Sequence, residues 1–379
     1  MKLRQKLEDF KVEEINEFDI LKSGQFKLYL LEKKGLESFA LIGYLAKQNN
    51  IPRSEIGVAG LKDKYAETSQ YITIPEKYEI KTTDEKNFKI TFIGFVDKPL
   101  KIGDLQGNRF EITVRDLNKD ELEKIKQRAE ELKKYGAPNY FDSQRFGSVI
   151  NNKFIAKYVV KRDYENAAKI FLTEHTKFEK SQIKKEKKQI LENWKNIENA
   201  EARTKFLRQI LDEYRKTKDW LKAYKKINYQ LRAMFVYAYQ SYLWNECVKE
   251  LLKKTVDAKK LYSVSYNIGT LLFYKEIDEK IPESFPSIGR EINLDEFQAE
   301  IINKVLSKEG LSIGDFDVKD EAGNFFKAEN RKLILKPEGF EMLKPEEDEL
   351  NKGKYKITLN FKLPKGSYAT IVTKKIFNK

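Results

Sequence analysis

The stretch AGLKDKYAETSQYITI, residues 59–74, joins a charged turn to a strand. Gly60 and the triplet Lys62-Asp63-Lys64 are typical of a solvated turn. The residues that follow alternate between polar and apolar side chains, which predicts a half-buried β-strand. A turn of this composition most often has no catalytic role. Any function of the carboxylate between the two lysines must therefore be inferred from the rest of the sequence.

The composition of the chain favours a polyanionic partner. Its 379 residues exceed the usual size of one core and predict two domains, or one domain with a large insertion. With 73 Lys and Arg against 59 Asp and Glu, the net charge of +14 favours nucleic acid, because basic side chains release counterions from phosphates. Solubility or heat adaptation explains the lysine excess equally well. The 24 Phe and 20 Tyr favour nucleic acid, since unstacked bases bind to aromatic faces, although most of these rings must lie in the cores.

The scarcity of soft ligands excludes several classes of enzyme. The single cysteine, Cys247, rules out an intrachain disulfide, and together with the single histidine, His175, it leaves too few ligands for a zinc site. The chain has neither a GxxxxGK[ST] nor a GxGxxG motif, which argues against nucleotide hydrolysis and dinucleotide chemistry. We therefore expect no metal and no cofactor, so that carboxylates, hydroxyls and lysines must carry any catalysis.

The N-terminal sequence MKLR leads into polar residues without a long apolar segment. This pattern predicts neither a signal peptide nor a transmembrane helix, and hence no membrane partner. We expect a monomer in the cytoplasm.

Alternating apolar residues predict strands in the first 117 residues. The alternating sets are Phe10 and Val12; Phe26, Leu28 and Leu30; and Phe110, Ile112 and Val114. Two segments have helical spacing instead. One is residues 36–48, with Leu36, Phe39, Ile42 or Gly43, and Ala46 on one stripe, and the other begins near Asp120, with Leu122, Ile125, Ala129 and Leu132 on one stripe and Gly136 at its end.

Residues 153–310 are mainly helical in pattern and include a helix with Phe235, Tyr239, Tyr242 and Leu243 at core-type spacing. Strand signals return in residues 332–337, 354–363 and 368–377. An alternating start, a helical middle and a β-rich end predict an α/β (α+β) fold in which one sheet is interrupted by an inserted helical domain and both termini join that sheet. The expected parts are residues 1–152, 153–324 and 325–379.

Four segments together resemble the TruD family of tRNA pseudouridine synthases. They are EDFKVEEI at 8–15, AGLKDKYAETSQ at 59–70, PNYFDSQRFGS at 138–148 and FKLPKGSYAT at 361–370, with weaker agreement in LQGNRFEITVRDL at 105–117 and YQSYLWN at 239–245. The resemblance implies a pseudouridine synthase core with a mixed or antiparallel sheet, interrupted by the family's insertion domain. It also implies a reaction without metal or cofactor on tRNA, most often at uridine 13 of the D arm, and on other RNAs as well.

By this resemblance Asp63 corresponds to the aspartate that pseudouridine synthases require. An ionised carboxylate can attack C1′ of the ribose or C6 of the uracil, or remove a proton. Flanking lysines would favour the charged form by lowering its pKa, although adjacent residues of an extended segment point in opposite directions. Lys62 and Gln70 serve equally well as scaffold for the loop.

The resemblance also implies a pocket for a uridine that has swung out of its helix. Its expected lining is Phe10, Asn139, Phe141 and Tyr368, with rings that stack on the base and an amide that reads its edge. The expected partners of the RNA or of the catalytic carboxylate are Arg4, Lys62, Gln144 and Arg145.

Two other functions compete with this prediction. A non-catalytic RNA-binding or chaperone protein could keep the same fold, but a carboxylate beside phosphates would only weaken its binding. A hydrolase with two carboxylates would need a second acid in the same cleft, and the recognised motifs contain none.

Overall fold

The chain folds into two compact units, and it passes from the first unit into the second and back again. The computed structural model describes residues 1–176, 179–278, 281–318 and 326–377. One unit comprises Met1–Ala137 with Leu335–Lys379, and the other comprises Pro138–Ile334. A central part of the sequence thus interrupts the first unit, and the crossings differ from the boundaries expected at 152/153 and 324/325. The assignment of these parts as domains stays a prediction.

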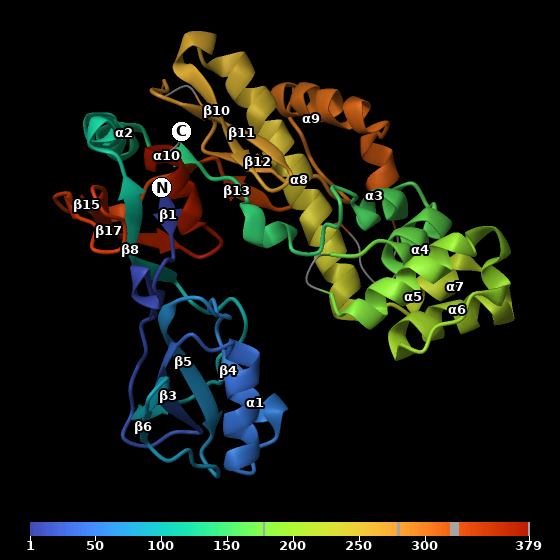
Figure 1. Cartoon of the computed structure of the whole chain (residues 1–379), viewed down its shortest axis with the longest axis horizontal. Helices are drawn as coiled ribbons and strands as arrows, with labels where there is room; N and C mark the ends of the chain where they lie inside the picture. The colour runs from blue at the N-terminus through green and yellow to red at the C-terminus, as the bar shows by residue number, and fades with distance from the viewer. Residues whose placement is uncertain (177–178, 279–280, 319–325, 378–379) are drawn as a thin grey trace. The chain divides into compact units, whose positions relative to one another are not determined.

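The first unit is built on a mixed sheet with 11 strands among its described residues (Figure 1). Their order is β15-β17-β8-β2-β5-β3-β7-β6, and off this path β1 pairs with β8, β16 with β17 and β4 with β5. The bounds are β1 Lys2–Leu3, β2 Phe10–Ile15, β3 Phe26–Lys34, β4 Gly57–Val58, β5 Glu67–Pro75, β6 Thr83–Glu85, β7 Phe88–Val96, β8 Gly107–Leu117, β15 Glu338–Met342, β16 Glu346–Glu347 and β17 Tyr355–Pro364. The pair β2–β5 is parallel, whereas β8 pairs antiparallel with both β2 and β17.

Strands from before and after the second unit join this sheet, as predicted, although the last predicted strand is not among them. On one side of β8, Phe10 of β2 lies opposite Ile112, and on the other side Phe361 of β17 lies opposite Phe110. The predicted combination of a mixed sheet with helices is confirmed.

The alternation in β2 and β8 is confirmed, but that in β3 is confirmed only in part. Phe10 and Val12 are buried, as are the three apolar residues predicted for β8. In β3, Leu28 is buried but Leu30 is only half-buried, whereas Tyr29 and Leu31 on the opposite face are fully buried. The strand is covered on both faces, and its register shifts against β7 between Leu28 and Tyr29, so a simple alternation does not describe it.

The α-helices among the described residues of the first unit are α1 (Ser38–Gln48), α2 (Leu122–Tyr135) and α10 (Ala369–Phe377). Helix α1 packs on the sheet, and α10 packs against α2. The predicted stripe of α2 is confirmed for Ile125, Ala129 and Leu132, and the helix ends at Gly136, whose φ of 69° favours glycine. The stripe predicted for α1 is wrong at Phe39, which is exposed. The buried stripe is Leu41, Ile42, Leu45 and Ala46.

The strand predicted for residues 368–377 is also wrong, because this segment forms α10. Its β-branched residues permit either structure locally. Packing against α2 favours the helix, which buries Ile371, Val372 and Ile376.

The second unit is mainly helical (Figure 1). Its helices are α3 Ile155–Val160, α4 Tyr164–Thr173, α5 Ser181–Glu192, α6 Lys205–Thr217, α7 Trp220–Lys225, α8 Tyr229–Thr255 and α9 Glu296–Glu309. Helices α4 to α7 form one group, and the long α8 packs against α9 and against a hairpin of β10 (Leu261–Tyr266) and β11 (Gly269–Tyr274). Two further strands, β12 (Ser284–Pro286) and β13 (Asn330–Lys332), pair antiparallel, and short β9 (Ala137–Pro138) pairs with β14 (Ile334–Leu335) where the chain crosses.

The stripe predicted for α8 is confirmed for Phe235, Tyr239 and Leu243, which are buried. Tyr242 is half-buried. Within the ranges that the structure describes, no helix combines the length and the apolar character that a membrane crossing requires.

Candidate active site

The site in the first unit centres on the loop that carries Asp63. This loop joins β4 to β5 and has no regular structure of its own. The ammonium of Lys33, from β3, donates hydrogen bonds to the carbonyl oxygens of Asp63 and Leu36, each at 2.9 Å. Burial lowers the pKa of Lys33 to about 8, although the negative charge of Asp63 opposes this shift. A buried cation therefore fixes the backbone of the proposed catalytic residue.

Ser38 and Gln70 hold the residues that precede Asp63. The hydroxyl of Ser38, at the start of α1, donates to the carbonyl of Lys62 at 3.0 Å and lies 3.2 Å from its N–H. The side chain of Gln70, from β5, donates to the carbonyl of Gly60 at 3.3 Å and is fully buried. Since buried polar groups rarely remain without partners, these bonds restrict the path of the loop.

Lys62 pairs with Glu14 of β2. Its ammonium lies 3.0 Å from the Glu14 carboxylate and donates to Asn108 of β8 at 2.5 Å. The two charged side chains are only 6% and 0% exposed, and burial raises the pKa of Glu14 and lowers the pKa of Lys62. Lys62 therefore ties the loop to the sheet, and the contacting cation of Asp63 comes from elsewhere.

Arg4 supplies that cation. Its Nη2 donates to Asp63 Oδ2 at 2.6 Å, and the two side chains are 31% and 22% exposed. Arg4 follows β1 with a φ of 58°, a left-handed conformation that is unfavourable for a long side chain. A charge-assisted hydrogen bond of this kind orients the carboxylate in a place that solvent still reaches.

Phe10 supports Arg4 from the other side. The guanidinium carbon lies 4.0 Å from the centre of the Phe10 ring, a cation–π contact. Phe10 is buried and meets the edge of Phe110 at 6.3 Å between ring centres. Tyr368, the other ring expected in this unit, is half-buried and directly precedes α10.

A second cluster lies in the second unit, around Asn139 and Arg331. Arg331 donates from Nη2 to Asn139 Oδ1 and from Nε to the Asn139 carbonyl, both at 2.9 Å. Asn139 Nδ2 in turn donates to the carbonyl of Lys332 at 3.0 Å, and the residue is 6% exposed. The carboxamide is thus held in one orientation, while a second N–H and a second lone pair allow it two further hydrogen bonds.

Phe141 packs in the same cluster. The Arg331 guanidinium lies 4.0 Å above its ring, and Trp244 of α8 meets it at 5.6 Å between centres. The backbone of Phe141 exchanges two hydrogen bonds with the side chain of Asn245, which is fully buried. The residues that resemble the family motif are therefore fixed to α8 on one side and to β13 on the other.

Gln144 and Arg145 follow in a short 3-10 helix, Ser143–Phe146. Arg145 Nε donates to the hydroxyl of Ser241 at 3.0 Å, and its guanidinium lies 5.1 Å from the Phe141 ring and 5.6 Å from that of Tyr237. Gln144 is exposed. The structure thus groups Arg4, Phe10, Lys62 and Asp63 in one unit and Asn139, Phe141 and Arg145 in the other, and the functions expected of them stay predictions.

Sequence reasoning missed Lys33, Glu14 and Arg331. Only Glu14 carries a signal: it shares the buried face of β2 with Phe10 and Val12, and an acid at such a position must find a partner. Arg331 offered none, because it lies far along the chain from Asn139. Among the described residues, no three His, Cys, Asp or Glu side chains converge into a group that could hold a metal ion.

Comparisons with known proteins match almost the whole chain. The family model described as tRNA pseudouridine synthase D (TruD) matches residues 1–264 and 274–376. A protein of Methanocaldococcus jannaschii, named as a probable tRNA pseudouridine synthase D 2, is 46% identical over 100% of this chain and 92% of its own. The tRNA pseudouridine synthase D of Aquifex aeolicus is 32% identical over 100% of this chain and 98% of its own. A crystal structure from Methanosarcina mazei with the same family name has a TM-score of 0.73 at 27% identity and covers 99% of this chain and 92% of its own.

Proposed function

The chain belongs to the TruD family of tRNA pseudouridine synthases, and on this premise we propose that it isomerises uridine to pseudouridine in tRNA with Asp63 as the essential carboxylate. The observation that supports this role is the hydrogen bond of 2.6 Å between Arg4 and Asp63 on a loop held by buried Lys33. The carboxylate is oriented and yet within reach of solvent, as a group that meets a substrate must be.

The proposed reaction balances within one nucleotide. The N1–C1′ bond of uridine breaks, the base turns, and a C5–C1′ bond forms. The proton leaves C5 and N1 takes up a proton, so no oxidant or reductant is consumed. Asp63 serves as nucleophile towards C1′ or C6, or as the base that removes a proton, and each of these roles uses an ionised oxygen.

The uridine must leave its stack before the carboxylate can reach it. We assign Phe10, Phe141 and Tyr368 as aromatic surfaces for the RNA and Asn139 as the group that reads the uracil edge. The carboxamide of Asn139, already bonded to Arg331 and to the Lys332 carbonyl, has one donor and one acceptor position for this purpose. The orientation imposed by Arg331 favours uracil over bases with another donor and acceptor pattern.

The rest of the RNA binds to basic side chains. Arg145 and Gln144 are candidates for phosphate contacts, and the net charge of +14 supports binding to a polyanion. The position that we propose is uridine 13 of the D arm. Activity on other RNAs, action as a monomer and a cytoplasmic location remain predictions.

Chemical mapping of pseudouridine in an unmodified tRNA transcript tests the proposal. The wild type is expected to form pseudouridine, whereas Asp63→Asn and Asp63→Ala form none and still bind the tRNA. Asp84→Asn, which changes an exposed carboxylate of β6, is the matched control and retains the activity. Product from the Asp63 variants would refute the assigned role. Failure of the wild type on every RNA, with RNA binding intact, would instead favour the non-catalytic alternative.

A further inference from the structure

The segment that carries Arg4 has little structure of its own. Strand β1 is two residues long and pairs only Lys2 with Arg115 and Leu3 with Val114. Arg4 follows in a left-handed conformation, and a single turn of 3-10 helix, Leu7–Asp9, leads into β2. Such a segment cannot hold a guanidinium against Asp63 by itself, because short pairings and single turns are marginal.

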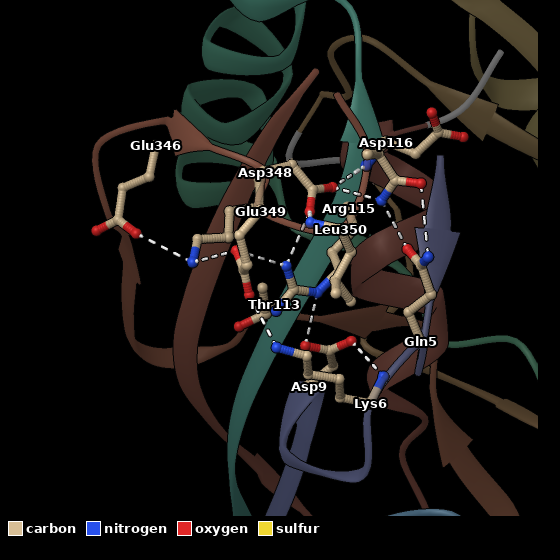
Figure 2. A network of polar contacts seen from close by, with 12 residues as sticks. Gln5, Lys6, Asp9, Thr113, Arg115, Asp116, Glu346, Asp348, Glu349 and Leu350 are labelled. Carbon is tan, nitrogen blue, oxygen red and sulfur yellow. Dashed lines mark hydrogen bonds and ion pairs between the residues drawn. The ribbon is translucent and has the colours of Figure 1, made fainter. Parts of the chain in front are cut away.

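The side chain of Arg115, from β8, anchors the end of this segment. The residue is 4% exposed, and its Nε donates to Asp9 Oδ1 at 2.8 Å (Figure 2). The other oxygen of Asp9 accepts from the N–H of Lys6 at 2.8 Å. The guanidinium therefore fixes the turn between Arg4 and Phe10.

The same guanidinium anchors the start of the segment through the loop after β16. Nη1 of Arg115 donates to Asp348 Oδ1 at 2.9 Å, as Figure 2 shows. Asp348 accepts from Asn351 Nδ2 at 2.7 Å, and Asn351 in turn accepts from the Lys2 ammonium at 2.7 Å and donates to Gln5 at 2.8 Å. Positions on both sides of Arg4 are thus tied to one buried cation.

Burial alone would raise the pKa of Asp348, but hydrogen bonds from the N–H of Asp116, from Asn351, from the N–H of Leu350 and from Arg115 outweigh it and lower the pKa. A buried ionic network is weak evidence for stability, because desolvation offsets much of its attraction, and it serves better to select one conformation. The conformation selected here places Arg4 between Asp63 and the Phe10 ring.

We propose that Arg115 is a positioning residue for the isomerisation, which holds residues 2–9 so that the Arg4 guanidinium stays on the Asp63 carboxylate. This inference rests on the proposed function of Asp63. Arg115 contacts neither substrate nor reacting atoms. Its planar fork reaches Asp9 and Asp348 at once, which a lysine ammonium does not do as well.

The test measures single-turnover pseudouridine formation and tRNA affinity separately. Arg115→Gln is expected to lower the rate at saturating tRNA about 10- to 100-fold, the size of effect that follows a small misplacement, with the affinity within about twofold of wild type. Arg115→Lys recovers part of this loss. Lys375→Gln removes another buried cation of the first unit, paired at 3.5 Å with Glu131 of α2, and is the matched control that lowers the melting temperature but not the rate.

A double-mutant cycle with Arg4 decides the route of the effect. If Arg115 acts through Arg4, the double variant Arg4→Gln Arg115→Gln is no slower than Arg4→Gln alone. Losses that multiply in the double variant, or an Arg115→Gln rate equal to wild type, overturn the proposal. If Arg115→Gln does not fold, Asp9→Asn takes its place in the same cycle. Activity retained by Asp63→Asn would contradict the proposed function of Asp63. That result is separate from the double-mutant cycle, which tests only whether Arg115 acts through Arg4.

Discussion

Two ion pairs meet at neighbouring positions of one loop, and they differ in access to solvent. The side chains of Lys62 and Glu14 are almost completely buried, and we call them the sealed pair. The side chains of Arg4 and Asp63 are about a quarter exposed, and we call them the open pair. Burial raises the pKa of Glu14 and lowers the pKa of Lys62, so it favours the neutral form of each side chain in this pair. Similar ion pairs therefore have two different roles: the sealed pair holds the loop in place, and the open pair orients the carboxylate that we propose as catalytic.

Breaking the sealed pair should have the largest effect. Lys62→Met leaves the Glu14 carboxylate buried without its cation, so the free energy of unfolding should fall by about 3–5 kcal/mol. Denaturant unfolding followed by fluorescence measures this loss. The double variant Lys62→Met Glu14→Leu is the control, and it should recover most of the stability. A loss of less than about 1 kcal/mol in the single variant would contradict the role of this pair.

The pH dependence of stability tests whether Lys33 is a buried cation. Because the folded pKa of Lys33, about 8, lies below its ordinary value of 10.5, the unfolded state binds more protons between these pH values. The stability of the wild type relative to Lys33→Met should therefore rise by about 2–3 kcal/mol from pH 8 to pH 10.5, and fall back as the pH drops through 8. Paired urea titrations at these pH values measure the difference. A flat difference would show that Lys33 is not a buried cation.

Breaking the open pair should change the rate more than the stability. Arg4→Gln should lower single-turnover isomerisation about 10- to 100-fold, or about 1.4–2.7 kcal/mol in the barrier. The free energy of unfolding should change by no more than about 1 kcal/mol, because the pair is partly exposed. Arg4→Lys keeps the charge and should fall between the two. An Arg4→Gln enzyme with the rate of the wild type would show that Arg4 does not orient the catalytic carboxylate.

Removing an exposed ion pair on the same sheet should have the smallest effect on stability. Lys11 of β2 lies 2.7 Å from Glu111 of β8, and both side chains are more than 40% exposed. Lys11→Gln should change the free energy of unfolding by about 0.2–1 kcal/mol, measured in the same urea titrations. A loss as large as that of Lys62→Met would show that exposure does not distinguish the pairs.

The sequence allows prediction of the parts whose pattern is local. Period-two alternation locates β2 and β8, and the acids, stripe and glycine of α2 locate that helix. The local pattern does not predict α10, because Ile371 and Val372 suit a strand as well as a helix. Contact with α2 is what favours the helix. The same is true of β3, whose two buried faces hide its alternation.

The candidate site divides in the same way. Motif resemblance predicts functions for Asp63, Asn139 and Phe141 and makes Arg4 a candidate cation for the carboxylate, and these functions stay predictions. Lys33, Arg115 and Arg331 act through partners that lie far away in the sequence, so a local pattern cannot reveal them. Their burial is a property of the fold and cannot be read from the sequence. A buried ionisable residue indicates a function only when its partner is known.

The release of tritium from tRNA labelled at C5 of uridine measures the proposed role of Asp63, since the C5 proton leaves only when the new C–C bond forms. Under single-turnover conditions the wild type should release label from one uridine per tRNA. Asp63→Asn should bind the tRNA with an affinity within a few fold of wild type and release none. Release by Asp63→Asn at the wild-type rate would contradict the assignment of Asp63 as the carboxylate that performs the chemistry.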